Sequence, residues 1–300
     1  MTNINVSIVG LPSSGKTVFL AVLSQEKDFE PLTEAAFELR QKYEDLRRGK
    51  WPDATDPNSK TGELSWQVLP EQSGLIISSR DFAGEVWQHF IDKYGNYQGS
   101  APKPDDFDRA MCEYLESSAA IAVCVDLAAV IDQNDFRQLW IPQAIRNYLA
   151  ARGIGDRRLA IVLTKYDMVR DFVRENGGLP KLLKDKLPAG MIDALKGRIF
   201  AVSAVQTRAD DRNVAVPDPK FESHGIAEVK VWALCQSQKM RLRLLARQIV
   251  ALAAPVLTIA VGWLMGKEVY PWSLGGYLVY IGVIWLISSV FLRVWKIVAK

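Results

Sequence analysis

The residues with the clearest chemical potential lie near the start of the chain, in the segment Gly10-Leu11-Pro12-Ser13-Ser14-Gly15-Lys16-Thr17. It follows a short apolar run and precedes a stretch with helical spacing, so we expect a loop between a strand and a helix. Glycines let backbone N–H groups turn toward an anion, and the start of a helix adds positive partial charge. The pattern therefore predicts a phosphate-binding loop, in which Lys16 reaches the terminal phosphates and the Thr17 hydroxyl ligates Mg²⁺.

Three further short segments follow along the chain: Asp81-Phe82-Ala83-Gly84, Thr164-Lys165-Tyr166-Asp167 and Ser203-Ala204. Each comes after an apolar run that is typical of a buried strand. The Asp167 carboxylate can accept hydrogen bonds from the N1–H and the exocyclic amine of guanine, a pair of donors that adenine lacks. The methylene stem of Lys165 can pack over the purine face. A bound guanine nucleotide explains all four segments together.

With these motifs the chain resembles the P-loop GTPases of the translation-factor and Ras-like (TRAFAC) class, and residues 15–20 are similar to bacterial double-GTPase modules. The resemblance implies that Asp81 holds Mg²⁺ through a water molecule and that the Gly84 N–H meets the γ-phosphate. It also implies that a backbone N–H of Ser203-Ala204 meets the guanine carbonyl oxygen. The nucleotide contacts it implies are Gly10, Ser13, Ser14, Gly15, Lys16, Thr17, Val18, Gly84, Thr164, Lys165, Asp167, Ser203 and Ala204.

No clear sequence motif marks the first switch, the segment that would sense the γ-phosphate together with the second switch after Gly84. In the class that the chain resembles, a threonine just before the second strand ligates Mg²⁺ and senses the γ-phosphate. We predict that Thr61 is this residue, and Thr55 is the second candidate. Alternatively, Thr61 is an ordinary turn threonine without such a role. The expected Mg²⁺ ligands are then Thr17, Asp81 and Thr61.

Glu85 stands where Ras-like enzymes carry the glutamine that orients the attacking water. A carboxylate there could position water, but it also adds negative charge beside the γ-phosphate. We therefore predict that Lys16, Thr61 and Glu85 support slow hydrolysis, which a partner could accelerate by supplying an arginine. His89, one helical turn further on, is an alternative water-orienting group or a structural histidine, and Arg80 is expected to be structural.

Apolar runs and helical spacings alternate along residues 1–238, the predicted GTPase domain. Strands are predicted over residues 5–9, 63–69, 75–80, 119–127, 159–163 and 199–202, and helices over residues 16–23, 107–116, 136–152 and 225–238. Several runs are apolar throughout, as expected for strands buried on both faces. The sequence thus predicts an α/β fold of the P-loop NTPase (G-domain-like) type, with a mainly parallel sheet and helices on both faces. Polar residues 28–62 are predicted to form a loop, and further loops are inserted near residues 94–106 and 206–224.

The C-terminal segment has a different composition. Residues 248–266 and 269–292 contain no charged side chain, and about 20 apolar residues suffice to cross a bilayer as a helix. We expect a two-helix transmembrane hairpin between a basic linker at 239–247 and a basic tail at 293–300; two buried core helices are the alternative. The positive-inside tendency then places the N-terminal domain and the C-terminus in the cytosol, as a two-pass protein of the bacterial cytoplasmic membrane.

The overall composition argues against a nucleic-acid-binding surface on the N-terminal domain and against a metal or redox site built from cysteines. The net charge is +3 and apolar residues make up 49% of the chain. All of the basic excess lies after residue 238, so the N-terminal domain is mildly acidic and offers no basic surface for nucleic acid. The 3 cysteines form no metal-binding or redox spacing and are expected to be reduced thiols.

Together these observations favour a membrane-anchored GTP-binding protein that binds Mg-GTP, hydrolyses it slowly to GDP and acts as a molecular switch. Its expected partners are the guanine nucleotide, the lipid bilayer and a regulatory or effector protein. Two alternatives stay open. One is a nucleotide-dependent scaffold with little hydrolysis, and the other is an ATPase coupled to a membrane process.

Overall fold

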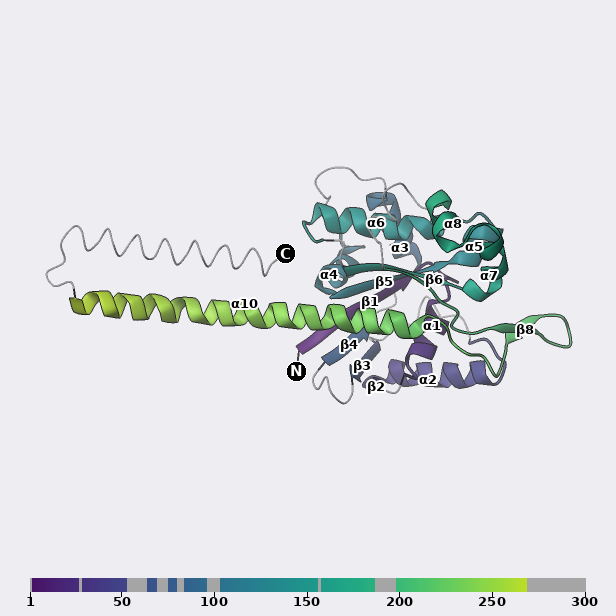
Figure 1. Cartoon of the computed structure of the whole chain (residues 1–300), viewed down its shortest axis with the longest axis horizontal. Coiled ribbons are helices and arrows are strands. Elements are labelled where there is room, and N and C mark those ends of the chain that lie inside the picture. Colours follow the sequence, from purple (N-terminus) through teal and green to yellow (C-terminus); the bar gives the residue numbers. More distant parts are fainter. Residues whose placement is uncertain are drawn as a thin grey trace. The chain divides into compact units, whose positions relative to one another are not determined.

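The fold is that of a computed structural model of the chain, which describes residues 2–26, 29–52, 64–68, 75–79, 84–95, 103–155, 158–186 and 198–268. The chain divides into two compact units, Met1–Ser237 and Gln238–Lys300. The first unit contains the sheet and the motifs described above (Figure 1).

Seven of the described strands form one sheet, in the order β2-β3-β4-β1-β5-β6-β7. Their bounds are β1 (Thr2–Gly10), β2 (Phe29–Pro31), β3 (Leu64–Val68), β4 (Leu75–Ser79), β5 (Ala120–Asp126), β6 (Leu159–Thr164) and β7 (Ile199–Ala201). β1 pairs in parallel with both β4 and β5, and the β5–β6 and β6–β7 pairs are also parallel. The β2–β3 and β3–β4 pairs are antiparallel. The prediction of a mainly parallel α/β sheet is confirmed.

The central strands are apolar because they are covered on both faces. Every residue of β5 and β6 is buried, which matches the uninterrupted apolar runs in the sequence. On β1, Val9 belongs to the core cluster that includes side chains of α3 (Gly84–Tyr94) and α6 (Arg137–Ala151). Val6 and Ile8 instead line a small cavity together with Leu23, the last residue of α1 (Lys16–Leu23). Since alternate residues of a strand point to opposite faces, both faces of β1 are apolar.

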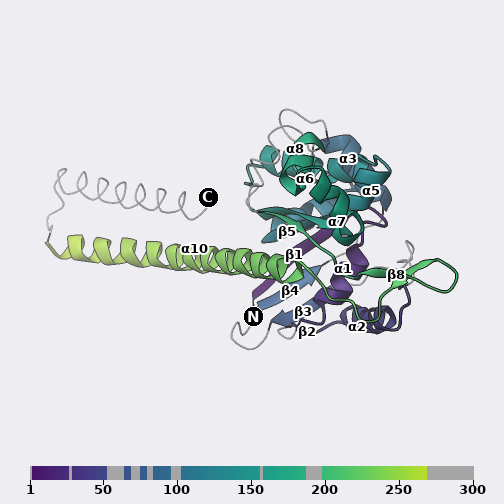
Figure 2. The same cartoon turned by 45° about the vertical axis from the view of Figure 1, so that its right-hand side comes forward.

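Helices lie on both sides of the sheet (Figures 1 and 2). One side carries α3 (Gly84–Tyr94), α4 (Arg109–Ser117) and α6 (Arg137–Ala151), and the other carries α1 (Lys16–Leu23) and α2 (Glu34–Arg47). Three further helices are α5 (Leu127–Asp132), α7 (Tyr166–Glu175) and α8 (Leu179–Lys186). α5 follows β5 directly, and a single residue separates the end of β6 from the start of α7, so these strand ends and helix starts lie at the same edge of the sheet.

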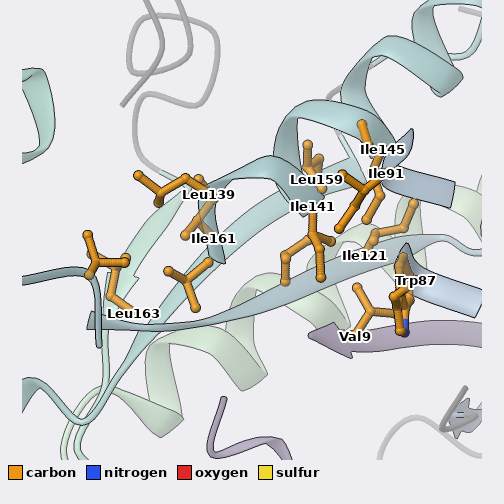
Figure 3. Close-up of a cluster of buried hydrophobic side chains, with 14 of the residues drawn as sticks. Val9, Trp87, Ile91, Ile121, Leu139, Ile141, Ile145, Leu159, Ile161 and Leu163 are labelled. Carbon is orange, nitrogen blue, oxygen red and sulfur yellow. The ribbon is translucent and has the colours of Figure 1, made fainter. Parts of the chain in front are cut away.

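Figure 3 shows the core on the α3 and α6 side of the sheet. Its labelled side chains come from strands and from these two helices: Val9, Trp87, Ile91, Ile121, Leu139, Ile141, Ile145, Leu159, Ile161 and Leu163. Each is at most 5% exposed. Full burial of an aliphatic or aromatic side chain stabilises a fold by about 1.5–3 kcal/mol. The packing fixes β5 and β6 against α3 and α6, and β6 ends at the motif residue Thr164.

The prediction of a loop over residues 28–62 is wrong for its first part, which contains β2 and α2. Thr33 stands at the N-cap position of α2, and Ala36, Leu39 and Leu46 are its buried residues. These three residues recur at helical spacing within a charged segment, so one face is apolar although the average composition is polar. Residues 53–63 of the predicted loop lie outside the described residues.

The inserted segment near residues 206–224 contains an antiparallel hairpin of β8 (Thr207–Ala209) and β9 (Ala215–Pro217). The indole of Trp51 donates to the carbonyl oxygen of Ala215 at 2.9 Å. Arg47, at the end of α2, donates to the carbonyl oxygen of Pro219 at 3.0 Å and lies 4.3 Å from the ring centre of Phe221. The hairpin segment is therefore fastened to the end of α2.

The longest described helix is α10 (Ile226–Glu268), with 43 residues. It joins the predicted helix at 225–238, the basic linker and residues 248–266 without interruption. Within the described part of the chain, no helix has the length and apolar character that a membrane crossing requires. The second predicted span, residues 269–292, lies outside the described residues. The predicted transmembrane hairpin thus gains no support from the structure.

Candidate functional site

The phosphate-loop segment joins β1 to α1, as the sequence predicts. β1 ends at Gly10 and α1 begins at Lys16. Between them, Ser13 and Gly15 adopt left-handed backbone conformations, with φ of 64° and 77°. The Ser14 N–H donates to the carbonyl oxygen of Leu11 at 3.2 Å. Left-handed residues in such a turn let successive N–H groups converge on one point, which suits an anion.

Two residues of the loop test whether a phosphate group fits. A Cβ on Gly10 would lie 2.5 Å from Ser14 Oγ and 2.7 Å from the carbonyl oxygen of Cys124, so only glycine can occupy this position without a shift. Ser14 is 1% exposed, and its Oγ has no hydrogen-bond partner among the described residues. A buried hydroxyl without a partner is costly, and a ligand oxygen would satisfy it. Lys16 Nζ lies 3.4 Å from the carbonyl oxygen of Gly10. The loop therefore fits a phosphate.

Thr164, the last residue of β6, connects the second motif to this loop. Its side chain is buried, and its hydroxyl donates to the carbonyl oxygen of Ser14 at 2.7 Å. The carbonyl oxygen of Val125 lies 3.1 Å from the same Oγ1. A Cβ on Gly15 would lie 3.4 Å from the Thr164 side chain, so the two segments are in contact. Motifs 150 positions apart in the sequence thus meet at one edge of the sheet.

Lys165 follows Thr164 and stands at the N-cap position of α7. Its backbone is left-handed, with φ of 56°, a conformation that costs about 1–2 kcal/mol for a residue with a side chain. Its ammonium group forms an ion pair with Asp126 at the end of β5. The next residue, Tyr166, donates its N–H to the carbonyl oxygen of Val202 at 3.2 Å. The turn that presents Lys165 and Asp167 is therefore held by the last residue of β5 and by the residue that follows β7.

Asp167, in the first turn of α7, is held beside the third motif. Its backbone N–H donates to Ser203 Oγ at 2.8 Å. Partial burial raises the pKa of the Asp167 carboxyl, and the Ser203 hydroxyl acts in the opposite direction. A desolvated carboxylate interacts more strongly with a hydrogen-bond donor than one in water. The position suits recognition of a ligand that offers donors.

The segment Ser203-Ala204 follows β7 and is anchored by its neighbour in space, His224. The Ser203 N–H donates to the carbonyl oxygen of His224 at 3.1 Å, and the His224 N–H donates back at 2.8 Å. Ser203 is 3% exposed, whereas Ala204 is half-buried. The two hydrogen bonds between Ser203 and His224 join the start and the end of the inserted segment. They also hold Ser203 in place beside Asp167.

The other predicted site residues are only partly described. Thr17 and Val18 are half-buried in the first turn of α1. Gly84 and Glu85 begin α3. Asp81 and the two candidate switch threonines, Thr61 and Thr55, lie outside the described residues, as does Arg80. The structure therefore brings together the phosphate loop, the Thr164–Asp167 motif and Ser203-Ala204.

His89 lies on α3 within a cluster of charged groups. Its Nε2 is 2.9 Å from Asp105, and its ring packs edge-on against Phe107 with centroids 5.2 Å apart. Lys93 Nζ lies 3.0 Å from both Asp105 and Asp108. Hydrogen bonds from Lys93 and His89 lower the pKa of the Asp105 carboxyl. His89 and Lys93 thus belong to one charged cluster, in which the lysine supplies positive charge to both carboxylates.

The sequence did not identify Asp126 as a site residue, and it placed Thr164 among the nucleotide contacts without predicting its hydrogen bond to the phosphate loop. Asp126 pairs with Thr164 in the β5–β6 register, and both residues end their strands. An acid that closes a fully apolar run was the available signal, since such a residue lies at the same sheet edge as the motif. Its partner, Lys165, is distant in sequence and only the sheet order brings the two together.

The fold and the loop define an α/β domain with a mainly parallel sheet and a glycine-containing, phosphate-loop segment between its first strand and its first helix. No protein-family model matches the chain, and no curated protein matches it either. Among the solved structures that match is the crystal structure of the G domain of the iron transporter FeoB from T. maritima. The two are 13% identical, with 78% of this chain and 99% of that chain covered, and the TM-score is 0.36.

Proposed function

We propose that this chain binds a guanine nucleotide at the edge of the sheet where β1, β6 and β7 end. The observation that carries the proposal is the hydrogen bond from Thr164 to the Ser14 carbonyl, 2.7 Å long. It sets the phosphate loop at a fixed position beside the turn that presents Asp167. A site for phosphates and a carboxylate that selects the base are thereby held at one edge of the sheet.

The phosphates would be bound by the loop, and the base by the other two motifs. Phosphate contacts are expected from the loop amides and from the side chains of Lys16 and Thr17. Asp167 would accept the N1–H and the exocyclic amine of guanine. Lys165 would pack on the purine face, and the Ser203-Ala204 backbone would meet the guanine carbonyl oxygen. The magnesium ligands remain those proposed from the sequence, Thr17 with Asp81 and Thr61; bound Mg²⁺ would offset charge on the phosphates.

We propose slow hydrolysis of GTP to GDP, with Glu85 in the position of a water-orienting residue. The carboxylate would face the negative γ-phosphate, which disfavours a rapid reaction. The same feature favours the second candidate function, a scaffold that binds partners when loaded with nucleotide and rarely hydrolyses it. Single-turnover hydrolysis by the purified protein separates the two: a scaffold would release no phosphate while the nucleotide stays bound.

We also propose, on the residue pattern alone, that residues 248–292 anchor the protein to a membrane with the nucleotide domain in the cytosol. The uncharged segments and their basic flanks support this proposal. Extraction of membranes with alkaline carbonate provides the test. An anchored protein stays in the pellet, and release into the supernatant would contradict the proposal.

The nucleotide assignment is tested by equilibrium binding of fluorescent GDP to the full chain, with GTP and ATP as competitors. GTP should compete, whereas ATP should compete about 10⁴-fold less well, because a site built for guanine donors leaves Asp167 unpaired with adenine. Equal competition by ATP would refute the guanine assignment.

The variant Asp167→Asn should bind GDP more weakly and xanthosine diphosphate more tightly, since an amide can donate to the second carbonyl of xanthine. The matched control is Asp171→Asn, one turn further along α7. Asp171 is paired with Arg174 at the surface, with 80% of its side chain exposed. This control should leave both affinities unchanged.

A further inference from the structure

Asp126 is a buried charged residue that the proposed function does not use. It ends β5, and its side chain is 6% exposed. Its register partner across the sheet is Thr164 of the neighbouring strand. Placing a carboxylate at a buried position is unfavourable unless its charge is compensated. Its partners therefore indicate what the residue is for.

The two carboxylate oxygens of Asp126 have different partners. Oδ1 accepts the backbone N–H of Ala129 at 2.9 Å, which caps the start of α5. Oδ2 forms the ion pair with the ammonium group of Lys165. Oδ1 thus caps α5, whereas Oδ2 binds Lys165 in the turn that follows the neighbouring strand β6.

The ion pair restricts a side chain that would otherwise have many rotamers. Lys165 is 36% exposed and starts from a left-handed backbone position between β6 and α7. With the backbone fixed by the turn and the ammonium fixed by Asp126, both ends of the methylene stem are defined. A lysine stem in one conformation presents a flat apolar strip.

We propose that Asp126 is a positioning residue for base recognition. It holds the Lys165 ammonium away from the base position, so that the stem, rather than the charge, meets the purine face. This inference rests on the proposed guanine-nucleotide function. The contribution of Lys165 is then packing, and the protein neutralises its charge before any nucleotide binds.

The test is Asp126→Asn in the full chain. Asparagine caps helices about as well as aspartate, so the start of α5 is retained while the charge is removed. We expect GDP to bind about tenfold more weakly, the scale of one charge-assisted hydrogen bond. Binding of inorganic pyrophosphate, measured by competition, should not change because this probe meets only the phosphate loop. The control Asp135→Asn removes a carboxylate that pairs with Arg137 at the start of α6, and it should leave GDP binding unchanged.

A second arm uses Lys165→Met, which keeps an apolar stem without the ammonium. In that background, Asp126→Asn should cause no further loss of GDP affinity. An equal loss with and without Lys165, or a parallel loss of pyrophosphate binding, would show that Asp126 acts only on the fold and would overturn the inference.

Two further outcomes separate the possible failures. If the unmodified chain does not bind GDP, the proposed function fails first. If the unmodified chain binds GDP and Asp126→Asn binds it as tightly, only the role of Asp126 is wrong. Asp126→Ser, which also supplies a cap, guards against a folding defect peculiar to asparagine. Unfolding of both variants, seen by circular dichroism, would mean that the carboxylate serves stability and would equally overturn the inference.

Discussion

Thr164→Val removes the hydroxyl group that joins β6 to the phosphate loop while nearly preserving the shape of the side chain. Thr164 is 4% exposed, and its hydroxyl donates to the carbonyl oxygen of Ser14 at 2.7 Å. In the variant this buried acceptor loses its donor. A hydrogen bond contributes about 1 kcal/mol net, and an unsatisfied buried acceptor adds a penalty, so we expect unfolding to become easier by about 2 kcal/mol.

The expected loss of stability can be checked by measuring Tm and GDP affinity. For a domain of this size, about 1 kcal/mol shifts Tm by roughly 2–4 °C, so thermal unfolding should occur roughly 4–8 °C lower. If the lost bond also loosens the loop that binds phosphate, GDP affinity should fall as well, by up to about 30-fold for 2 kcal/mol.

The control is Thr207→Val, a similar change in the peripheral strand β8. It should shift Tm by less than about 2 °C, as is usual for surface substitutions. A Thr164→Val protein with unchanged Tm and unchanged GDP affinity would refute the reasoning that this hydroxyl connects the two halves of the site. A decrease in Tm for Thr164→Val no larger than that for Thr207→Val would also refute this reasoning.

Three other predictions concern the loop, the second switch and the cluster beside it. Gly10→Ala should abolish GDP binding in an equilibrium assay, because the new Cβ would lie 2.7 Å from a backbone oxygen; retained affinity would contradict the tight loop. Glu85→Gln should raise the single-turnover rate of GTP hydrolysis about tenfold or more by removing charge near the γ-phosphate, and an unchanged rate would argue against that position for Glu85. The Asp105 carboxyl has a folded pKa below its unfolded value, so its stabilising contribution is present above about pH 4 and is lost as the pH falls further. Asp105→Asn should therefore flatten the decline of Tm between pH 5 and pH 3, whereas Asp106→Asn, at an exposed neighbouring position, should not.

The phosphate loop and the central strands could be predicted because their signals are local. A glycine, a lysine and a threonine at fixed spacing predict the loop, and uninterrupted apolar runs predict β5 and β6 as strands covered on both faces. The segment containing α2 misled the prediction because its average composition is polar, although Ala36, Leu39 and Leu46 form a buried face. Composition hides such a face, whereas helical spacing reveals it.

The sequence by itself determined which residue types are available for phosphate and guanine recognition, and the order in which they occur. Only the tertiary structure decided which of them meet: Thr164 with Ser14, Asp167 with Ser203, and Lys165 with Asp126. It also showed that His89 Nε2 lies 2.9 Å from Asp105. The physical reason is that a hydrogen bond or an ion pair acts over a few ångströms, while residues far apart in sequence reach that distance only when strand order and helix packing place them there.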